Sequence, residues 1–368
     1  MTMADDRRLK VLSAIVTDYV RTREPVGSRA LVERYRLGVS PATIRNDMAA
    51  LEDEGYIHQP HTSAGRVPTE KGYRLFVDEV ARIKPLSAPE RRAITALLAG
   101  AVDLEQVVAR TVRALAQLTG QLAVVEYPSL RYAALQHLEL VALGPERVLL
   151  VIITDTGRVD QRTVTLRIRT GSSASSTAGS HRETGFDMAD VVDPLVLERL
   201  RTRLNSALVG RRAADVAPIL TSLAEQAPAD ERHLLDAVAD ELIAALHPDA
   251  EERLVVAGTA NLARATPDFS SLGPLLDAVE EQVVLLRLFT ADDALAGENR
   301  MRVSIGSENN DDALAEASVV TTTYGPGTGE AVAHLGVIGP TRMDYPATMT
   351  AVRAVARYLS RFLSPPET

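Results

Sequence analysis

The chain has 368 residues, of which 46% are hydrophobic and 24% charged, with a formal net charge of -9 and no cysteine. The length favours two or three domains, and the absence of cysteine excludes disulfides, zinc–thiolate sites and cysteine nucleophiles. No apolar run reaches the ~18 residues that a membrane span needs, and the N-terminus lacks the apolar core of a signal peptide. We therefore expect a cytoplasmic protein with no membrane contact.

Charge is distributed unevenly along the chain. Residues 1–85 hold 14 Lys and Arg against 12 Asp and Glu, whereas acidic residues are in excess in the remainder. Because the phosphate field is screened within ~10 Å, a nucleic-acid binder needs local positive charge rather than a basic total. The distribution permits a DNA-binding head on an acidic body. Arginine outnumbers lysine 37 to 3, which is typical of a genome-wide bias, so a single arginine is weak support for any function.

The first 85 residues follow the plan of a winged helix-turn-helix. An apolar residue recurs at helical spacing up to residue 20, and Ser28 is placed to cap a second helix. Ser40 is placed to cap a third helix that ends at Gly55, and Thr69 to cap a fourth. Between the last two helices, two strand-like segments flank the polar turn "HTSAGR". Three short helices followed by a two-stranded hairpin make this plan.

The remainder predicts an α+β multidomain fold with a mostly helical insertion. A helical, Ala- and Leu-rich stretch runs from 88 to about 120, and the low-complexity segment 170–184 is expected to be a disordered loop. Strands are predicted at 137–143, 147–154, 164–168, 301–306, 318–325 and 330–339, and helices around 197–208, 235–246, 272–286 and 352–362.

The third helix is the candidate reader of DNA bases. In a helix-turn-helix the second motif helix lies in the major groove with its N-terminal residues at the base edges. Arg bonds guanine bidentately, Asn bonds adenine, and a methyl-bearing side chain touches the thymine methyl. Ile44, Met48 and Leu51 fall on the inward face of this helix. The opposite face presents the base-reading candidates Thr43, Arg45 and Asn46.

The turn from His58 to Lys71 is the candidate wing. A wing must be polar and must hold its shape, so that ordering it does not weaken binding. Pro60 and Pro68 stiffen its flanks, and backbone N–H groups near Ser40 suit a phosphate. We expect close approach to the duplex at Gly65, and phosphate contacts from donors along the turn, namely His61, Thr62, Ser63, Arg66 and Lys71.

Other interpretations of these residues stay open. A short helix after a turn also occurs in helical domains that bind no DNA. His58 and His61 could be metal ligands, but Pro60 lies between them and no third His or Cys is near, so we expect solvent-facing wing residues and no metal site.

An enzyme is the second alternative. The spaced glycines of "YGPGTGE" (324–330) could cradle phosphate, but a nucleotide fingerprint needs a helix after them and the next residues predict a strand. A hairpin loop is favoured. Arg342 and Asp344 in "GPTRMDY" could look catalytic, but their place before the last helix favours a structural turn, with Arg342 bonding backbone carbonyls. No Ser/His/Asp set assembles, so we expect no catalysis and no cofactor.

Several long segments resemble one family. The runs "EPVGSRAL", "VSPATIRNDMAALEDEGYIHQPHTSAGRVPTEKGYR" and, far downstream, "GVIGPTRMDY" are similar to the HrcA-type heat-inducible transcription repressors. Weaker similarity lies at "GTANLARATPDF" and "IGSENNDDALAEASVVTTTYG". Together these segments extend over most of the chain.

The resemblance implies a homodimeric repressor that binds the CIRCE inverted repeat upstream of chaperone operons, kept active by the GroEL chaperonin. It implies a winged-helix head (1–85), a GAF-like domain (88–190 and 296–368) and a dimerising domain inserted at 191–295. By position it makes Thr43, Arg45 and Asn46 base-reading residues. It implies backbone contacts at Ser28, Arg29, Ser40, His61, Ser63, Arg66 and Lys71.

A dimer adds the discrimination of two heads when their spacing matches the half-sites. The leucine-rich helices of the insertion supply interface candidates, although each of these side chains could equally pack within its own subunit. The candidates are Leu197, Leu204, Leu276 and Val283. A repressor controlled by a small effector bound in the GAF-like domain remains an alternative.

Overall fold

The computed structural model describes residues 3–61, 64–80, 92, 94, 96, 104–128, 134–155, 157–166, 193–246, 253–281, 284–287, 301–325 and 333–364. The chain forms two compact units. The first unites Met1–Tyr127 with Arg253–Phe362, and the second is built mainly from Pro128–Glu252. No helix among these residues is long and apolar enough to cross a membrane.

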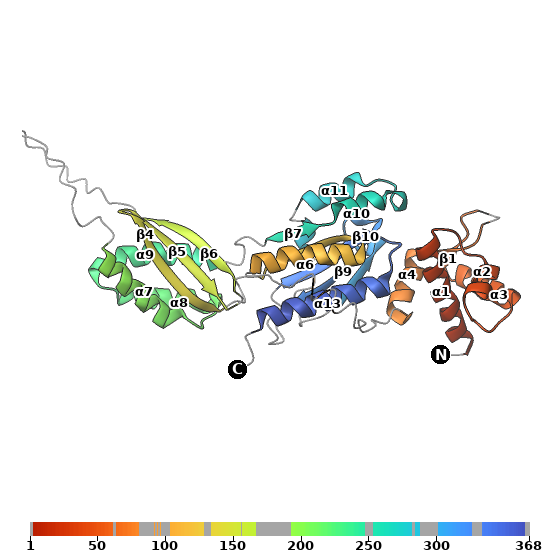
Figure 1. The fold of residues 1–368 in the computed structure, drawn as a ribbon, viewed down its shortest axis with the longest axis horizontal. Coiled ribbons are helices and arrows are strands. Elements are labelled where there is room, and N and C mark those ends of the chain that lie inside the picture. The colour runs from red at the N-terminus through yellow and green to blue at the C-terminus, as the bar shows by residue number, and fades with distance from the viewer. Residues whose placement is uncertain are drawn as a thin grey trace, which may run out of the picture. The chain divides into compact units, whose positions relative to one another are not determined.

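The first unit begins with a winged helix-turn-helix head, drawn in red to orange in Figure 1. Its core is formed where α3 packs against α1 and α2, because Ile44, Met48 and Leu51 are buried on one side of α3 as predicted. The elements are α1 (Met3–Thr22), α2 (Ser28–Arg34), α3 (Pro41–Asp53), β1 (Ile57–His58), β2 (Val67–Pro68), α4 (Glu70–Leu75) and the π-helical turn η1 (Phe76–Val80).

Two of the three predicted helix caps are confirmed and one is wrong. The Ser40 hydroxyl accepts from the Thr43 N–H at 3.2 Å, and the Thr69 hydroxyl accepts from the Gly72 N–H at 3.1 Å. Ser28, by contrast, is the first residue of α2, and Gly27 occupies the cap position without a side-chain bond. Glycine is tolerated at this position, so Gly27 and Ser28 were both possible cap residues. The prediction chose Ser28, and the structure has Gly27.

The body of the first unit is a five-stranded sheet in the order β7-β3-β10-β9-β8, with every neighbouring pair antiparallel. The long β9–β10 pair runs from Ala317↔Pro340 to Tyr324↔Ala333. The strands are β3 (Leu122–Glu126), β7 (Leu254–Ala257), β8 (Met301–Ile305), β9 (Ala317–Tyr324) and β10 (Ala333–Pro340). The strands predicted at 301–306 and 318–325 are confirmed, as is 330–339 from Ala333 onward, since 330–332 lie outside the described residues. The short strands β3 and β7 were missed.

Helices cover both faces of this sheet (Figure 1). On one face α6 (Leu104–Thr119) and α13 (Tyr345–Leu363) lie side by side, and Ala114 of α6 shares a cluster with Ala354 and Tyr358 of α13. On the other face α10 (Thr259–Arg264), the short helix η3 (Thr266–Asp268) and α11 (Gly273–Glu280) pack over a second cluster. Burial on both faces explains why β9 and β10 have almost no exposed residue.

The second unit is a three-stranded antiparallel meander, β4-β5-β6, with helices on one face. Its core joins inward residues of the strands to the leucine rows of the helices. The elements are β4 (Leu135–Gly144), β5 (Arg147–Thr154), β6 (Val159–Thr165), α7 (Pro194–Leu208), α8 (Ala213–Glu225) and α9 (Ala229–Leu246). The strand predicted at 164–168 begins five residues earlier, at Val159. Its start was missed because six of the seven β6 residues are exposed or half-buried and show no apolar alternation.

The predicted edges of the insertion are therefore wrong. The expected domain at 191–295 is replaced by a unit that begins at Pro128 and ends at Glu252. The strands β4 to β6 were assigned to the body, but they pair only with one another and pack on α7 and α9. The order of elements along the chain did not reveal the boundary, because β3 of one sheet is followed in that order by β4 of the other. The segment 170–184, predicted to be disordered, lies outside the described residues.

Candidate nucleic-acid interface

The outer edge of α3 is built by its N-terminus and by the burial of its opposite face. Ser40 caps the helix, and Pro41 takes the first helical position, where its missing N–H costs nothing. With Ile44 buried inward, Arg45 and Asn46 are exposed. Thr43 is half-buried, and its hydroxyl lies 3.0 Å from that of Ser40.

A buried acidic residue on α3 was missed by the sequence analysis. Asp47 is buried beside Met48, and its carboxylate accepts two bonds from the Arg7 guanidinium of α1, at 2.7 and 2.9 Å. These bonds, and the charge of Asp47, raise the pKa of Arg7. The pair fixes α3 against α1. Asp47 follows Ile44 by three residues and so falls on the inward face of the helix. A charged residue at such a position was the signal that could have revealed the pair.

The wing is attached to the loop between α1 and α2. Val26 and Arg66 exchange both backbone hydrogen bonds, each 2.9 Å long. A Cβ on Gly65 would lie 2.5 Å from the Val26 carbonyl carbon, so glycine is required here by the protein backbone. This internal contact gives a reason for Gly65 that the sequence did not indicate, and the predicted close approach to a duplex stays a prediction.

Two of the predicted phosphate donors are held by protein groups. The Arg66 guanidinium forms an ion pair with Glu52 at 2.7 Å. The Lys71 ammonium donates to the Glu54 carbonyl at 2.9 Å and lies 4.6 Å from the centre of the Tyr56 ring. Both cations therefore bind the C-terminal turn of α3 or its immediate continuation, where positive charge is favourable.

Three arginines of the head have no acidic partner among the described residues. Arg29, Arg36 and Arg45 are exposed, and no carboxylate of the described residues pairs with them. Arg36 precedes the α3 cap by four residues and was missed, although its place in the helix-turn-helix turn was a usable signal. His58 and His61 are also exposed. The candidates Thr62 and Ser63 lie outside the described residues, and Ser28 is half-buried.

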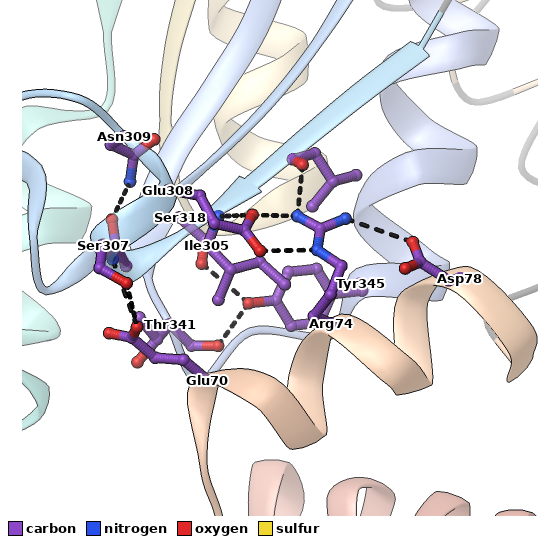
Figure 2. A network of polar contacts seen from close by, with 12 residues as sticks. Glu70, Arg74, Asp78, Ile305, Ser307, Glu308, Asn309, Ser318, Thr341 and Tyr345 are labelled. Carbon is purple, nitrogen blue, oxygen red and sulfur yellow. Dashed lines mark hydrogen bonds and ion pairs between the residues drawn. The ribbon is translucent and has the colours of Figure 1, made fainter. Parts of the chain in front are cut away.

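A polar joint connects the head to the body within the first unit (Figure 2). From α4, Arg74 donates to Glu308 at 2.8 Å and to the Val303 carbonyl at 2.6 Å. Glu70, one turn earlier, accepts from the Ser307 hydroxyl at 2.7 Å. Beside these contacts the Tyr73 and Tyr345 rings pack with centroids 5.8 Å apart. The sequence run "TEKGYR" after the wing thus binds the body rather than extending the DNA-facing surface.

Electrostatics of the joint favour the ionised pair. Burial opposes ionisation of Glu308, but hydrogen bonds from Arg74 and from the Ile305 N–H outweigh it and lower the pKa of Glu308. The bond to Glu308 likewise raises the pKa of Arg74. Burial raises the pKa of Tyr345, so its hydroxyl stays protonated and bonds Ser318 and the Thr341 carbonyl.

The motif "GPTRMDY" forms the second part of the joint. Arg342 binds both oxygens of Asp268 at 2.8 Å and donates to the Val20 carbonyl of α1 at 2.6 Å. Asp344 accepts from the Ala347 N–H at the start of α13. The predicted structural turn is confirmed, including the bond from Arg342 to a backbone carbonyl. Most of the glycine-rich loop at 324–330 lies outside the described residues.

The leucine candidates for a dimer interface are largely internal. Leu197 is 7% exposed and Leu204 is fully buried in the core of the second unit, so both are wrong as interface residues. Their helical row faces the three-stranded sheet of the same chain. Leu276 lies in the first unit and is 38% exposed, and Val283 lies outside the described residues.

Comparison with known proteins decides the family. The family model described as the HrcA protein C-terminal domain matches residues 105–349. The chain is 54% identical to the heat-inducible transcription repressor HrcA of Streptomyces avermitilis over 98% of this chain and 99% of the relative, and 56% identical to that of Beutenbergia cavernae over the same shares. The chain belongs to the HrcA family of heat-inducible transcription repressors. A DeoR-like helix-turn-helix model matches residues 14–69, which include α2, α3 and both strands of the wing.

One solved structure has a similar fold over the whole chain. The crystal structure of a hypothetical protein is similar with a TM-score of 0.62 and 24% identity, over 98% of each chain. At this identity the likeness concerns the fold alone. A helix-turn-helix head in a member of a transcription-repressor family is a DNA-binding domain. The exposed edge of α3 is therefore the candidate surface for base contacts.

Proposed function

We propose that the chain is a homodimeric repressor of chaperone operons that binds the CIRCE inverted repeat and is kept active by the GroEL chaperonin. In this proposal Thr43, Arg45 and Asn46 read bases, and Arg29, Ser40 and the wing around His61 contact the DNA backbone. Arg66 and Lys71, with Ser28, remain predicted backbone contacts. Their protein partners limit how far Arg66 and Lys71 could contribute.

The exposed N-terminal edge of α3 is the observation that supports this proposal most. Its inner face is fixed by apolar burial and by the Arg7–Asp47 bonds, whereas Arg45 and Asn46 have no competing acidic partner among the described residues. A base-reading helix needs both conditions, because its donors must be available and its position must already be set.

A partly apolar face of the second unit, with an apolar central strand, supports the homodimer. Alternate residues of β5 point away from the helical side, and these residues (Leu149, Val151 and Ile153) are only half-buried. Their apolar neighbours on the flanking strands are exposed by 43% at Val141 and by 54% at Val159, whereas Glu139 and Gln161 lie directly opposite Val151. The central strand is apolar on both faces, as expected for a strand with a cover on each side. A second copy is the proposed cover, and this face replaces the buried leucines as the interface.

Sedimentation and mobility shifts test the dimer. A charge in the middle of the face, Val151→Glu, is expected to give monomers and to abolish the cooperative shift of a full inverted repeat while leaving weak binding to a half-site. The control Thr202→Glu adds the same charge on an exposed position of α7. A Val151→Glu protein that sediments as a dimer would remove this face from the proposal.

The GroEL dependence needs a ligand that binds the DNA-competent state better than the inactive state. Added GroEL is expected to raise the fraction of repressor that binds operator at fixed repressor concentration. GroEL preloaded with an unfolded client is the control and is expected to give no increase, because its site is occupied. An operator titration unchanged by GroEL would contradict this part of the proposal alone.

A further inference from the structure

A polar cavity of about 470 Å³ lies in the first unit beside the joint. Its walls come from the end of α6, from α10 and η3, from the turn before α13 and from Arg23, which follows α1. The volume falls in the usual range for small-molecule sites, roughly 300–1,000 Å³.

Positive charge exceeds negative charge in the wall. The guanidiniums of Arg23, Arg264 and Arg342 line the cavity together with a single carboxylate, that of Asp268. Asp268 is shared: Arg342 binds both of its oxygens at 2.8 Å, and Arg23 reaches one of them at 3.2 Å. The cavity therefore has an excess of two positive charges over its one carboxylate.

Arg264 and Arg23 are the side chains available to a ligand. Arg264 is exposed and bonds the Asn261 side-chain oxygen, a neutral acceptor, and it has no acidic partner in the described part of the chain. Arg23 is half-exposed and forms the longest of the bonds to Asp268. Arg342, only 12% exposed and bonded at three nitrogens, is fixed. The exposed amide of Gln117 adds a neutral donor to the wall.

We infer that this cavity binds a small oxyanion, a phosphate or carboxylate group of a metabolite, between Arg264 and Arg23. Guanidinium groups bind both anions through paired N–H donors. The polar wall does not suit an apolar ligand. Arg23 directly follows α1 and, like Arg342, links the head to Asp268 of the body. An anion bound by Arg23 therefore contacts this link, which makes the site an effector site beside the joint.

Calorimetric titration of the full chain tests the site, at constant ionic strength and in the absence of DNA. Inorganic phosphate is one probe and succinate is the other, so the two arms distinguish the chemical source of the oxyanion. Saturable binding of one probe per chain is expected in at least one arm. Arg264→Gln is expected to weaken it by at least about tenfold, since a hydrogen bond to a charged group is lost.

Two further variants make the result specific. Gln117→Glu adds a negative charge to the wall with little change in shape, and it is expected to weaken binding as well. The control Arg113→Gln removes an exposed arginine of α6 that does not line the cavity, and it is expected to bind as the unchanged protein does. No saturable binding of either probe, or equal binding by all four proteins, would overturn the inference. Neither result bears on operator binding, which is measured separately.

Discussion

Two groups of arginines in the first unit are in opposite situations. On the outer side of the head, defined here by Arg29, Arg36 and Arg45, the arginines are exposed without an acidic partner among the described residues. At the joint, Arg74 of the head and Arg342 of the body each bind a carboxylate and a backbone carbonyl. The comparison teaches that residue type alone does not separate the arginines of this arginine-rich chain. The presence or absence of an internal partner does.

The difference has a physical cause. A guanidinium that is already bonded must break those bonds before it reaches a phosphate, whereas an exposed one exchanges only water and counterions. Arg66 and Lys71 lie between the two extremes, because each has a protein partner yet remains at the surface of the head. Substitutions on the outer side should therefore change DNA affinity, whereas substitutions at the joint should change the stability of the head.

The largest effect is expected at Gly72, where α4 packs closely against the backbone of Tyr56. A Cβ at this position would lie well inside contact distance of the Tyr56 carbonyl oxygen, so Gly72→Ala must displace α4 from the wing. We expect a loss of about 3 kcal/mol of stability, typical of overpacking against backbone. Thermal unfolding measures it. Gly144→Ala, where a Cβ meets nothing within 4 Å, is the control, and equal losses in both variants would show that the tight approach is not important.

The next effect is expected on the outer side. Arg45→Ala should cost ~1–3 kcal/mol of operator affinity and relax base preference, because a bidentate base contact is lost. Arg36→Ala is the matched comparison and should weaken all duplexes alike, with a salt slope lower by ~1. Mobility shifts against the inverted repeat and its single-base variants separate the two. If both variants lose affinity equally on every sequence, Arg45 does not read bases.

At the joint we expect a smaller, pH-dependent effect. The pKa of Glu308 is lowered in the folded protein, so its contribution to stability is present above the ordinary glutamate pKa and is lost as the pH falls through the lowered value. Glu308→Gln should therefore be less stable than the unchanged protein near neutral pH, by less than about 1 kcal/mol because the pair is partly exposed. The two unfolding midpoints should converge in acid, and a constant difference at every pH would contradict the assignment.

The smallest effect is expected at Lys71. Its bond to the Glu54 carbonyl and its position over the Tyr56 ring are each worth less than about 1 kcal/mol at an exposed site. Lys71→Ala should therefore lower the stability of the head slightly. A salt slope of DNA binding that also falls by ~1 would show that Lys71 reaches a phosphate despite its partner, and an unchanged slope would assign it to the protein alone.

Much of the head could be predicted from local signals. The caps at Ser40 and Thr69, the inward face of α3 and the short hairpin all depend on residues close together in sequence. The Arg7–Asp47 pair and the requirement at Gly65 depend on segments about 40 residues apart, which no local pattern indicates. For the same reason the sequence did not reveal the protein partners of Arg66 and Lys71.

The rest of the chain was predicted less completely. Long, strongly apolar strands such as β5 and β9 were found, but β3 and β7 are too short to show a pattern. The edges of the second unit were missed because the partner of a strand is chosen in three dimensions. The rows at Leu197 and Leu204 were correctly predicted as helical, yet their burial against β4 and β5 was decided only by packing.

The sequence by itself determined the helix periodicities, the caps, the wing and the family resemblance, because each depends on neighbouring residues or on long shared runs. Only the tertiary structure decided which arginines are engaged, which sheet each strand joins, and where a cavity with excess positive charge lies. These properties depend on distances between segments far apart in the chain, and such distances exist only once the chain has folded.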